Sequence, residues 1–379
     1  METSTSLQGQ LEIFFYTGAE AEFEDLTRYK QFGLHPITLG DVLPKPFTCV
    51  SDVNKEPRYR IMLKLGFGAF ATVWLARDLV EKRYVAVKVG LGSDIPLPDR
   101  EAEILSQLCK TGPGKHGYQR VIELLDVFIV EGPNGFHQCL VTEVISPLNP
   151  HIANFGIALP QLEQFKEDDI TDHFANPEVI PVVPRDPTFP LNSVPPYIVQ
   201  PVTIADFLQS RKAFPAGPVT IKILDFGRAP TAIRPPEVVL HELCDGRIGS
   251  TWSEAADIWA VGCTLYHVKS GNELISTWGS LKDYLFRAIQ FGGPPPETWP
   301  KLWNTPDRQH ENSLYDRVKV WEVREANRNS SRTPHDEERS DFLNFIKRMI
   351  ITNPDERSPT RVLLTDPFMV ERRREEESI

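Results

Sequence analysis

Residues 65–78 read Leu-Gly-Phe-Gly-Ala-Phe-Ala-Thr-Val-Trp-Leu-Ala-Arg-Asp, and this stretch decides the fold. Gly66 and Gly68 have no Cβ atom, so the backbone amides around them can approach a phosphate closely. The same glycine spacing also fits a dinucleotide-binding turn, but that turn needs a helix directly after Ala71. Residues 72–75 are β-prone instead. We therefore expect a β-hairpin over phosphates. An ordinary hairpin turn and a dinucleotide-binding oxidoreductase are the alternatives.

A lysine ends the next predicted strand. Residues 85–88 read Val-Ala-Val-Lys, and Lys88 lies at the distance from the glycine turn at which an ammonium group can reach α- and β-phosphates. Such a lysine needs a carboxylate partner on the helix that we predict over residues 99–108. We expect Glu101 to be this partner, because it can face the sheet while the apolar residues after it pack. Glu103 is the competing candidate.

A carboxylate that can bind a metal ion follows far downstream. Residues 221–227 read Ile-Lys-Ile-Leu-Asp-Phe-Gly, which predicts a strand that ends at Asp225. A carboxylate in this position can hold Mg²⁺, which bridges phosphate oxygens and neutralises the charge that develops during phosphoryl transfer. The spacing therefore predicts a site for ATP and Mg²⁺.

The composition argues against several classes of protein. The net charge of −11 opposes direct binding of nucleic acid and fits a basic partner. No apolar run approaches the ~18 residues that a membrane span needs, and the first residues lack the basic start of a secretory signal. The five scattered cysteines show no metal-binding spacing. We expect a protein with reduced thiols, located in the cytoplasm and nucleus.

The chain is predicted to divide into four segments. These are an N-terminal extension at 1–58, a β-rich lobe with a hinge at 59–145, a helical lobe at 146–370 and a charged tail at 371–379. Residues 1–57 are polar and irregular, and alternating apolar residues then predict five strands, at 60–65, 72–77, 84–89, 121–130 and 137–144.

The helical lobe is predicted to contain a long insert. Ten prolines lie from Pro177 to Pro218, which predicts an inserted loop, partly extended or disordered, over about 160–218. A capping box at 251–254 should open a helix over 255–268, and a second amphipathic helix is predicted at 340–350.

Three further motifs lie in the C-terminal half of the chain. They are Arg-Pro-Pro-Glu at 234–237, Asp-Ile-Trp-Ala-Val-Gly at 257–262 and Asn-Pro-Asp-Glu-Arg at 353–357. Together with the glycine turn, Lys88 and Asp-Phe-Gly, they resemble the protein kinases over about residues 59–370. The resemblance implies a two-lobed α+β fold, with a β-rich N-lobe and a mainly helical C-lobe. It also implies a buried ion pair between Glu237 and Arg357 that ties the large lobe together.

Within the kinases, the chain resembles the SR-protein kinases, fungal members especially. Residues 65–78 carry the likeness, and Gly-Leu-His-Pro at 33–36 and Gly-Asp-Val at 40–42 are similar to the lead-in of that family. A long insert inside the kinase domain is another family feature. The resemblance implies a Ser/Thr protein kinase that transfers the γ-phosphate of ATP to serines in Arg-Ser-rich splicing factors.

The resemblance also assigns residues to the site. Lys88 and Glu101 would be catalytic, Asn154 and Asp225 would bind Mg²⁺, and adenine would meet the backbone of Glu143 and Ile145. The full set of nucleotide-binding residues would be Leu65, Gly66, Phe67, Gly68, Ala69, Val73, Ala86, Lys88, Glu143 and Ile145.

The chain departs from the kinase pattern in two places. The position of the catalytic Asp falls on Asn149, which cannot accept a proton as a carboxylate does. Two helices that kinases place after the hinge are missing around 146–151, and the activation segment at 228–236 is short. Gaps in a gene model are one interpretation. The other is a catalytically inactive pseudokinase that binds nucleotide or serves as a scaffold. Because the usual packing partners are absent, we expect the large lobe to be loosely packed around 147–160.

Overall fold

The computed structural model describes most of the chain, in two compact units that span Met1–Gly227 and Arg228–Ile379. The described residues are 13–15, 23–112, 114, 117–147, 155–174, 179–215, 219–224, 226, 231–300 and 336–370. By packing, the chain therefore divides at Gly227, and the lobe boundaries predicted at 58, 145 and 370 stay predictions. Among the described residues, no helix has the length and apolar character needed to cross a membrane.

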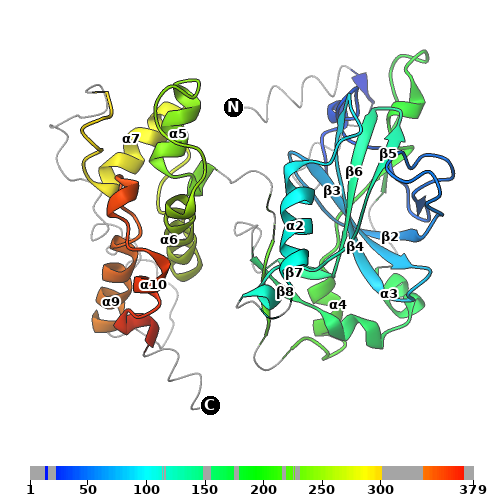
Figure 1. Ribbon diagram of the computed structural model, residues 1–379. Coiled ribbons are helices and arrows are strands. Elements are labelled where there is room, and N and C mark those ends of the chain that lie inside the picture. Colours follow the sequence, from blue (N-terminus) through cyan, green and yellow to red (C-terminus); the bar gives the residue numbers. More distant parts are fainter. Residues whose placement is uncertain are drawn as a thin grey trace. The chain divides into compact units, whose positions relative to one another are not determined.

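A six-stranded antiparallel sheet forms the centre of the first unit (Figure 1). Its strand order is β1-β2-β3-β4-β6-β5. The strands are β1 (Val42–Leu43), β2 (Tyr59–Phe67), β3 (Ala71–Asp78), β4 (Tyr84–Ser93), β5 (Leu124–Gly132) and β6 (Gly135–Thr142). All five strands predicted from the sequence are present, and β1, which lies in the extension, was not predicted.

Strand β3 settles the first choice between folds. It begins at Ala71, directly after the glycine turn, where a dinucleotide-binding turn requires a helix. The amide of Gly68 donates to the carbonyl of Ala71 at 2.9 Å, which closes the hairpin. The structure therefore excludes the dinucleotide-binding alternative and confirms the predicted β-hairpin.

Both faces of this sheet are buried, which explains the apolar composition of its central strands. Trp74 and Val87 lie in a core on one face, whereas Leu75 and Tyr84 lie in a core on the other. Neighbouring residues of a strand point to opposite faces, so one strand supplies both cores.

Helix α2 (Arg100–Thr111) lies along the sheet (Figure 1). Asp99 caps its first turn by accepting from the amide of Ala102 at 2.9 Å. Ala102 and Leu105 then pack against Leu140 of β6. The helix predicted at 99–108 is confirmed, with three further residues at its C-terminal end.

The N-terminal extension is more ordered than its sequence suggests. It forms the short helix η1 (Leu26–Arg28) and strand β1, and its residues Phe23, Leu26 and Leu34 are buried in one cluster. Apart from these two short elements, the described part after residue 22 is irregular, as predicted, but it is not merely polar, because it buries apolar side chains. The apolar residues of the extension are too far apart in the sequence to show the periodicity of a helix or a strand.

The insert was predicted to be a loop that is partly extended or disordered. Its described residues are partly extended, in two short strands, but they also form short helices and pack into the first unit. Ile180 and Ile198 pack in the same cluster as the extension, and Phe207 is buried under the sheet. Prolines stand at the ends of its short elements, where they disturb no ladder. These elements are η3 (Pro160–Gln164), α3 (Glu167–His173), β9 (Val179–Pro181), η4 (Leu191–Ser193), β10 (Tyr197–Val199) and α4 (Ile204–Ser210).

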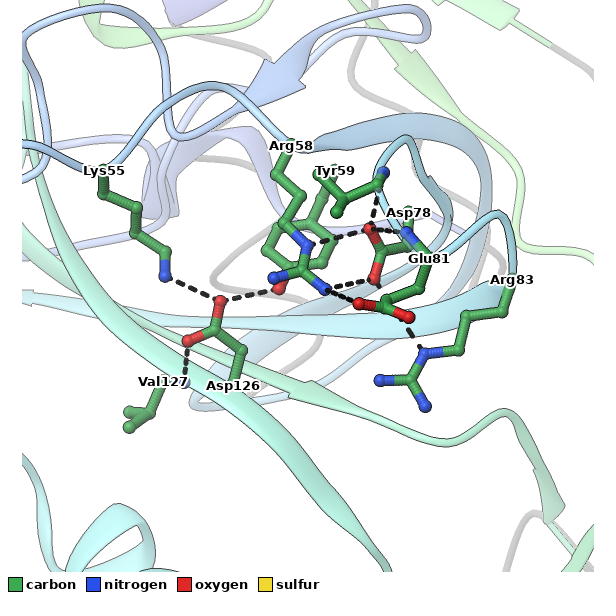
Figure 2. Close-up of polar contacts among 9 residues, drawn as sticks. Lys55, Arg58, Tyr59, Asp78, Glu81, Arg83, Asp126 and Val127 are labelled. Carbon is green, nitrogen blue, oxygen red and sulfur yellow. Dashed lines mark hydrogen bonds and ion pairs between the residues drawn. The ribbon is translucent and has the colours of Figure 1, made fainter.

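A network of charged side chains holds the start of β2 to its neighbours (Figure 2). Arg58 donates through Nε and Nη2 to the two carboxylate oxygens of Asp78, each at 2.8 Å. The hydroxyl of Tyr59 donates to Asp126 at 2.6 Å, and Lys55 pairs with the same carboxylate at 2.7 Å. Burial opposes ionisation of Asp78, but the bonds from Arg58 and two backbone amides win and lower the pKa of its carboxyl group.

A second, three-stranded sheet carries the downstream motif. Strand β8 (Phe155–Ala158) pairs with both β7 (Ile145–Pro147) and β11 (Ile221–Ile223). A parallel bridge between Val121 and Ile223 links this sheet to the residues before β5. Strand β8 is part of the segment 147–160, which was predicted to be loosely packed. Within the described residues, this strand pairs with a neighbouring strand on each side.

The described residues of the second unit form helices and no strand. Trp259 and Tyr284 lie at the centre of its core, fully buried. The helices are α5 (Pro236–Leu243), α6 (Glu254–Ser270), α7 (Leu281–Gly292), α9 (Asp336–Lys347) and α10 (Thr360–Leu363), with short turns η5 (Thr231–Ile233) and η7 (Pro354–Glu356). A β-rich unit and a helical unit confirm the predicted α+β class.

Two helix boundaries differ from the prediction. The cap of α6 is Ser253, whose hydroxyl accepts from the amide of Ala256 at 3.3 Å. The predicted capping box began two residues earlier, at Thr251, because the 251–254 spacing fits that motif as well. Helix α9 begins four residues before the predicted 340 and ends three before 350.

Candidate functional site

Lys88 and Glu101 meet in the first unit. The ammonium of Lys88 on β4 lies 2.9 and 2.7 Å from the two carboxylate oxygens of Glu101 on α2. The side chain of Glu101 is 9% exposed and that of Lys88 is 29% exposed, so part of the lysine side chain is open to solvent. Glu103, the competing candidate, is exposed. The helix cap and the packing of α2 on β6 thus bring together the two residues that the sequence paired.

The glycine turn has room beside it. A Cβ atom built on Gly66 or Gly68 would meet no other atom within 4 Å. The packing of the protein therefore does not require glycine at either position, and open space next to the backbone is what a closely approaching phosphate needs. Across the sheet, Val73 of β3 stands opposite Lys88 in the register, which places the lysine next to the hairpin that carries this turn.

The remaining residues predicted to contact the nucleotide lie on nearby strands. Leu65, Gly66 and Phe67 end β2, Val73 lies on β3 and Ala86 lies on β4 opposite Thr142. Ala69 lies in the turn that joins β2 to β3.

The hinge residues are partly engaged within the protein. The amide of Glu143 donates to the carbonyl of Glu123 at 3.3 Å, and its carboxylate pairs with Lys222 at 2.7 Å. Ile145 stands opposite Ala158 in the ladder between β7 and β8. The carbonyl of Glu143 also accepts from the hydroxyl of Thr142 at 3.2 Å. Both backbone groups of Glu143 are thus engaged within the protein, and the predicted contact with adenine stays a prediction.

A cavity of about 910 Å³ lies next to the hinge but is not this site. Its lining includes Tyr118, Glu143, Leu159 and Lys222, from the segments around β5, the hinge and β11. Neither Lys88 nor the glycine turn lines it.

The predicted catalytic loop and metal ligands cannot be placed. Asn149, Asn154 and Asp225 lie outside the described residues. Phe226, the neighbour of Asp225, packs against the cluster that contains Ala102 of α2. An amide and a carboxylate are oxygen donors of the kind that Mg²⁺ prefers, so the residue types fit this metal. The described residues contain no group of three or more metal-ligating side chains.

One contact to the turn was not predicted from the sequence. Arg28 of the extension donates to the carbonyl of Gly68 at 3.1 Å and also to the carbonyl of Ala69. Arg28 and Gly68 are 40 positions apart in the sequence, which explains why no local pattern gave a signal for this contact.

The predicted ion pair of the second unit is confirmed. Arg357 donates to both carboxylate oxygens of Glu237, at 2.6 and 2.7 Å, and the two side chains are 1% and 2% exposed. Arg357 also donates to the carbonyls of Ala255 and Ile351, at 2.8 and 2.7 Å, and its guanidinium lies over the ring of Trp259. The donors of Arg357 are thus used within the protein, which gives the pair a structural role.

The lysine–glutamate pair beside the glycine turn, the sheet that carries it and the buried ion pair of the helical unit are features of the protein-kinase class that the sequence resembles. Comparison with known proteins gives the same class. No protein-family model matches the chain. A serine/threonine protein kinase of Aspergillus fumigatus is 26% identical over 93% of this chain and 92% of its own length.

Two further relatives narrow the kind of kinase. The serine/threonine-protein kinase spk-1 of Caenorhabditis elegans is 36% identical over 33% of this chain and 12% of its own length. SRSF protein kinase 3 of Homo sapiens is 34% identical over 33% of this chain and 20% of its own length. The chain is a homologue of serine/threonine protein kinases of the SR-protein kinase type.

Proposed function

We propose that this protein is an ATP-dependent kinase that phosphorylates serines in Arg-Ser-rich proteins. The observation that carries the proposal is the Lys88–Glu101 pair, which lies beside a glycine turn where a Cβ atom built on Gly66 or Gly68 would meet no atom within 4 Å. An ammonium group held in place and backbone amides that can approach closely are groups that bind the α- and β-phosphates of a nucleotide.

Each residue of the site would have one task. Lys88 would bind the α- and β-phosphates, and Glu101 would hold the ammonium in place. Asn154 and Asp225 would hold Mg²⁺, and the hinge at Glu143 and Ile145 would meet adenine. Bound Mg-ATP would supply the transferable phosphoryl group together with neutralisation of its charge.

The substrate class is argued from charge and relationship. The chain carries a net charge of −11, which attracts a basic peptide over long distances. A relative is named as a kinase of SRSF proteins. We propose that such substrates are met in the cytoplasm and nucleus, and that neither nucleic acid nor a membrane is bound directly.

The second candidate is a nucleotide-binding pseudokinase that acts as a scaffold. Asn149 at the position of the catalytic Asp favours it, because an amide cannot take the proton of the attacking serine. Replacement of Asn149 by Asp separates the two candidates. Appearance of phosphate transfer only in Asn149→Asp would support the pseudokinase.

The test is transfer of labelled phosphate from Mg-ATP to an Arg-Ser repeat peptide. We expect transfer by the unaltered chain and its loss in Lys88→Ala, by about a hundredfold or more. Lys110→Ala, which removes an exposed lysine at the end of α2, is the matched control and should be as active as the unaltered chain. An Arg-Ala repeat peptide should accept nothing. An active kinase at this site would be refuted if Lys88→Ala still transferred phosphate. It would also be refuted if the unaltered chain transferred no more phosphate than Lys88→Ala.

A further inference from the structure

The N-terminal extension reaches the tip of the glycine turn through one side chain. The guanidinium of Arg28 donates to the carbonyls of two successive residues, Gly68 and Ala69. On the opposite strand, the amide of Leu91 donates to the carbonyl of Phe70 at 3.0 Å. The turn is therefore fixed from two sides, once by its own sheet and once by the extension.

The segment that carries Arg28 is itself firmly held. The carbonyl of Arg28 accepts from the amide of Leu34 at 2.8 Å, and Leu26, two residues before Arg28, is fully buried. Gly33 allows this close return, because a Cβ atom there would lie 1.9 Å from the carbonyl oxygen of Arg28. Arg28 thus extends from a rigid base, which limits the conformational entropy lost when its side chain is fixed.

The base is tied to the sheet and to the insert at the same time. The buried side-chain amide of Asn134 donates to the carbonyl of Leu34 in the extension and to that of Ser193 in the insert, both at 2.7 Å. Lys64 of β2 forms a buried ion pair with Glu24 of the extension. These long-range contacts tie the extension to β2, the first strand of the hairpin that carries the glycine turn, and to the insert.

We infer that Arg28 is a positioning residue for nucleotide binding, which it supports by holding the glycine turn through the carbonyls of Gly68 and Ala69. This inference rests on the proposed function, because it concerns the same site. A glycine-rich turn has much backbone freedom to lose when it closes on phosphates. Fixing it beforehand lowers that cost and raises affinity without any direct contact between Arg28 and the nucleotide.

The planar fork of arginine is the property that matters here. Its several N–H donors can reach two carbonyl oxygens at once, whereas lysine is a point charge. Arg28→Lys therefore keeps the charge and loses the two-carbonyl contact. Lys30→Ala removes an exposed cation from the same segment and is the matched control.

The first measurement is hydrogen exchange of the intact chain without nucleotide. We expect the amides of residues 66–71 to exchange about three- to tenfold faster in Arg28→Ala and in Arg28→Lys than in the unaltered chain or in Lys30→Ala. Equal exchange in all four would overturn the inference, whatever the chain binds. Melting temperatures would show that the variants are folded.

The second measurement is the affinity of the same four proteins for Mg-ATP. We expect Arg28→Ala and Arg28→Lys to bind about three- to tenfold more weakly than the other two. Full affinity in Arg28→Lys would overturn the inference in favour of simple charge attraction. If the unaltered chain binds no Mg-ATP, the proposed function fails. The inference then fails as well, because Arg28 positions no nucleotide, even if the exchange result shows that it holds the turn.

Discussion

At the scale of single residues, the site depends on a choice between two glutamates. Glu101 approaches Lys88 and Glu103 is exposed, although both lie in the first turn of α2. The spacing of apolar residues on a helix decides this, because Glu101 is on the side that packs.

Glu101→Gln should therefore weaken nucleotide binding and Glu103→Gln should not. The neutral amide leaves Lys88 without its charged partner, and we expect about tenfold lower affinity, or ~1.4 kcal/mol. The rise in melting temperature with Mg-ATP measures this, since a ligand that binds only the folded state stabilises it. An equal rise in both variants would contradict the assignment of Glu101.

A pair of buried histidines should make stability depend on pH. Burial, and then the nearby His137 and Lys45, lower the pKa of His35 to about 3. Burial lowers the pKa of His137 as well. In an unfolded chain histidine titrates near ~6.5. Below that pH the unfolded chain binds a proton that the folded chain does not, so acid favours unfolding.

The free energy of unfolding should consequently fall between pH 7 and pH 5. Below the pKa of the unfolded chain, His35 alone contributes a loss of about 1.4 kcal/mol per pH unit. Urea unfolding at several pH values measures the slope, and His35→Leu should make it shallower. A slope that is the same in the variant would show that His35 is not buried in its neutral form.

At the scale of elements, the sequence predicted what is local and missed what is distant. The strands and the Lys88–Glu101 pair follow from alternation and short spacing, which residues within one element carry themselves. The folding of the insert does not, since its helix α4 packs in a cluster that includes residues of β2 and β3, far away in the sequence. The contact of Arg28 with Gly68 is likewise set by the path of the extension.

Removal of the Phe207 ring should test whether the insert is part of the core. Phe207 of α4 is fully buried in a cluster that joins residues of the insert to residues of the sheet. We expect Phe207→Ala to cost about 3–5 kcal/mol in the unfolding of the first unit. Leu191→Ala, in the same insert but exposed, should cost under ~0.5 kcal/mol. Equal small effects would mean that the insert is a dispensable loop.

The ion pair between α5 and the segment after η7 should stabilise the second unit alone. Arg357→Ala leaves Glu237 buried without a partner, which costs about 3–5 kcal/mol. Hydrogen exchange should speed up in α6, whereas the strands β2–β4 should be unaffected. Arg234→Ala breaks a more exposed pair with Glu242 and is the control. Protection of α6 unchanged in Arg357→Ala would contradict a structural role for the pair.

At the scale of the whole molecule, two units with separate cores carry different parts of the kinase pattern. The first holds the glycine turn, Lys88 and Glu101. The second holds the Glu237–Arg357 pair. The order of the motifs in the sequence predicted that a β-rich part would come first and a helical part second. It could not show how the extension and insert enclose the first sheet, because those contacts join residues far apart in the chain.

Equilibrium binding of Mg-ATP to the intact chain is the most direct measurement of whether Lys88 lies in a nucleotide site. Calorimetric titration should give the same affinity for the unaltered chain and Lys110→Ala, and an affinity at least about tenfold lower for Lys88→Ala. Equal affinity in all three, or no binding by the unaltered chain, would contradict a nucleotide site at Lys88.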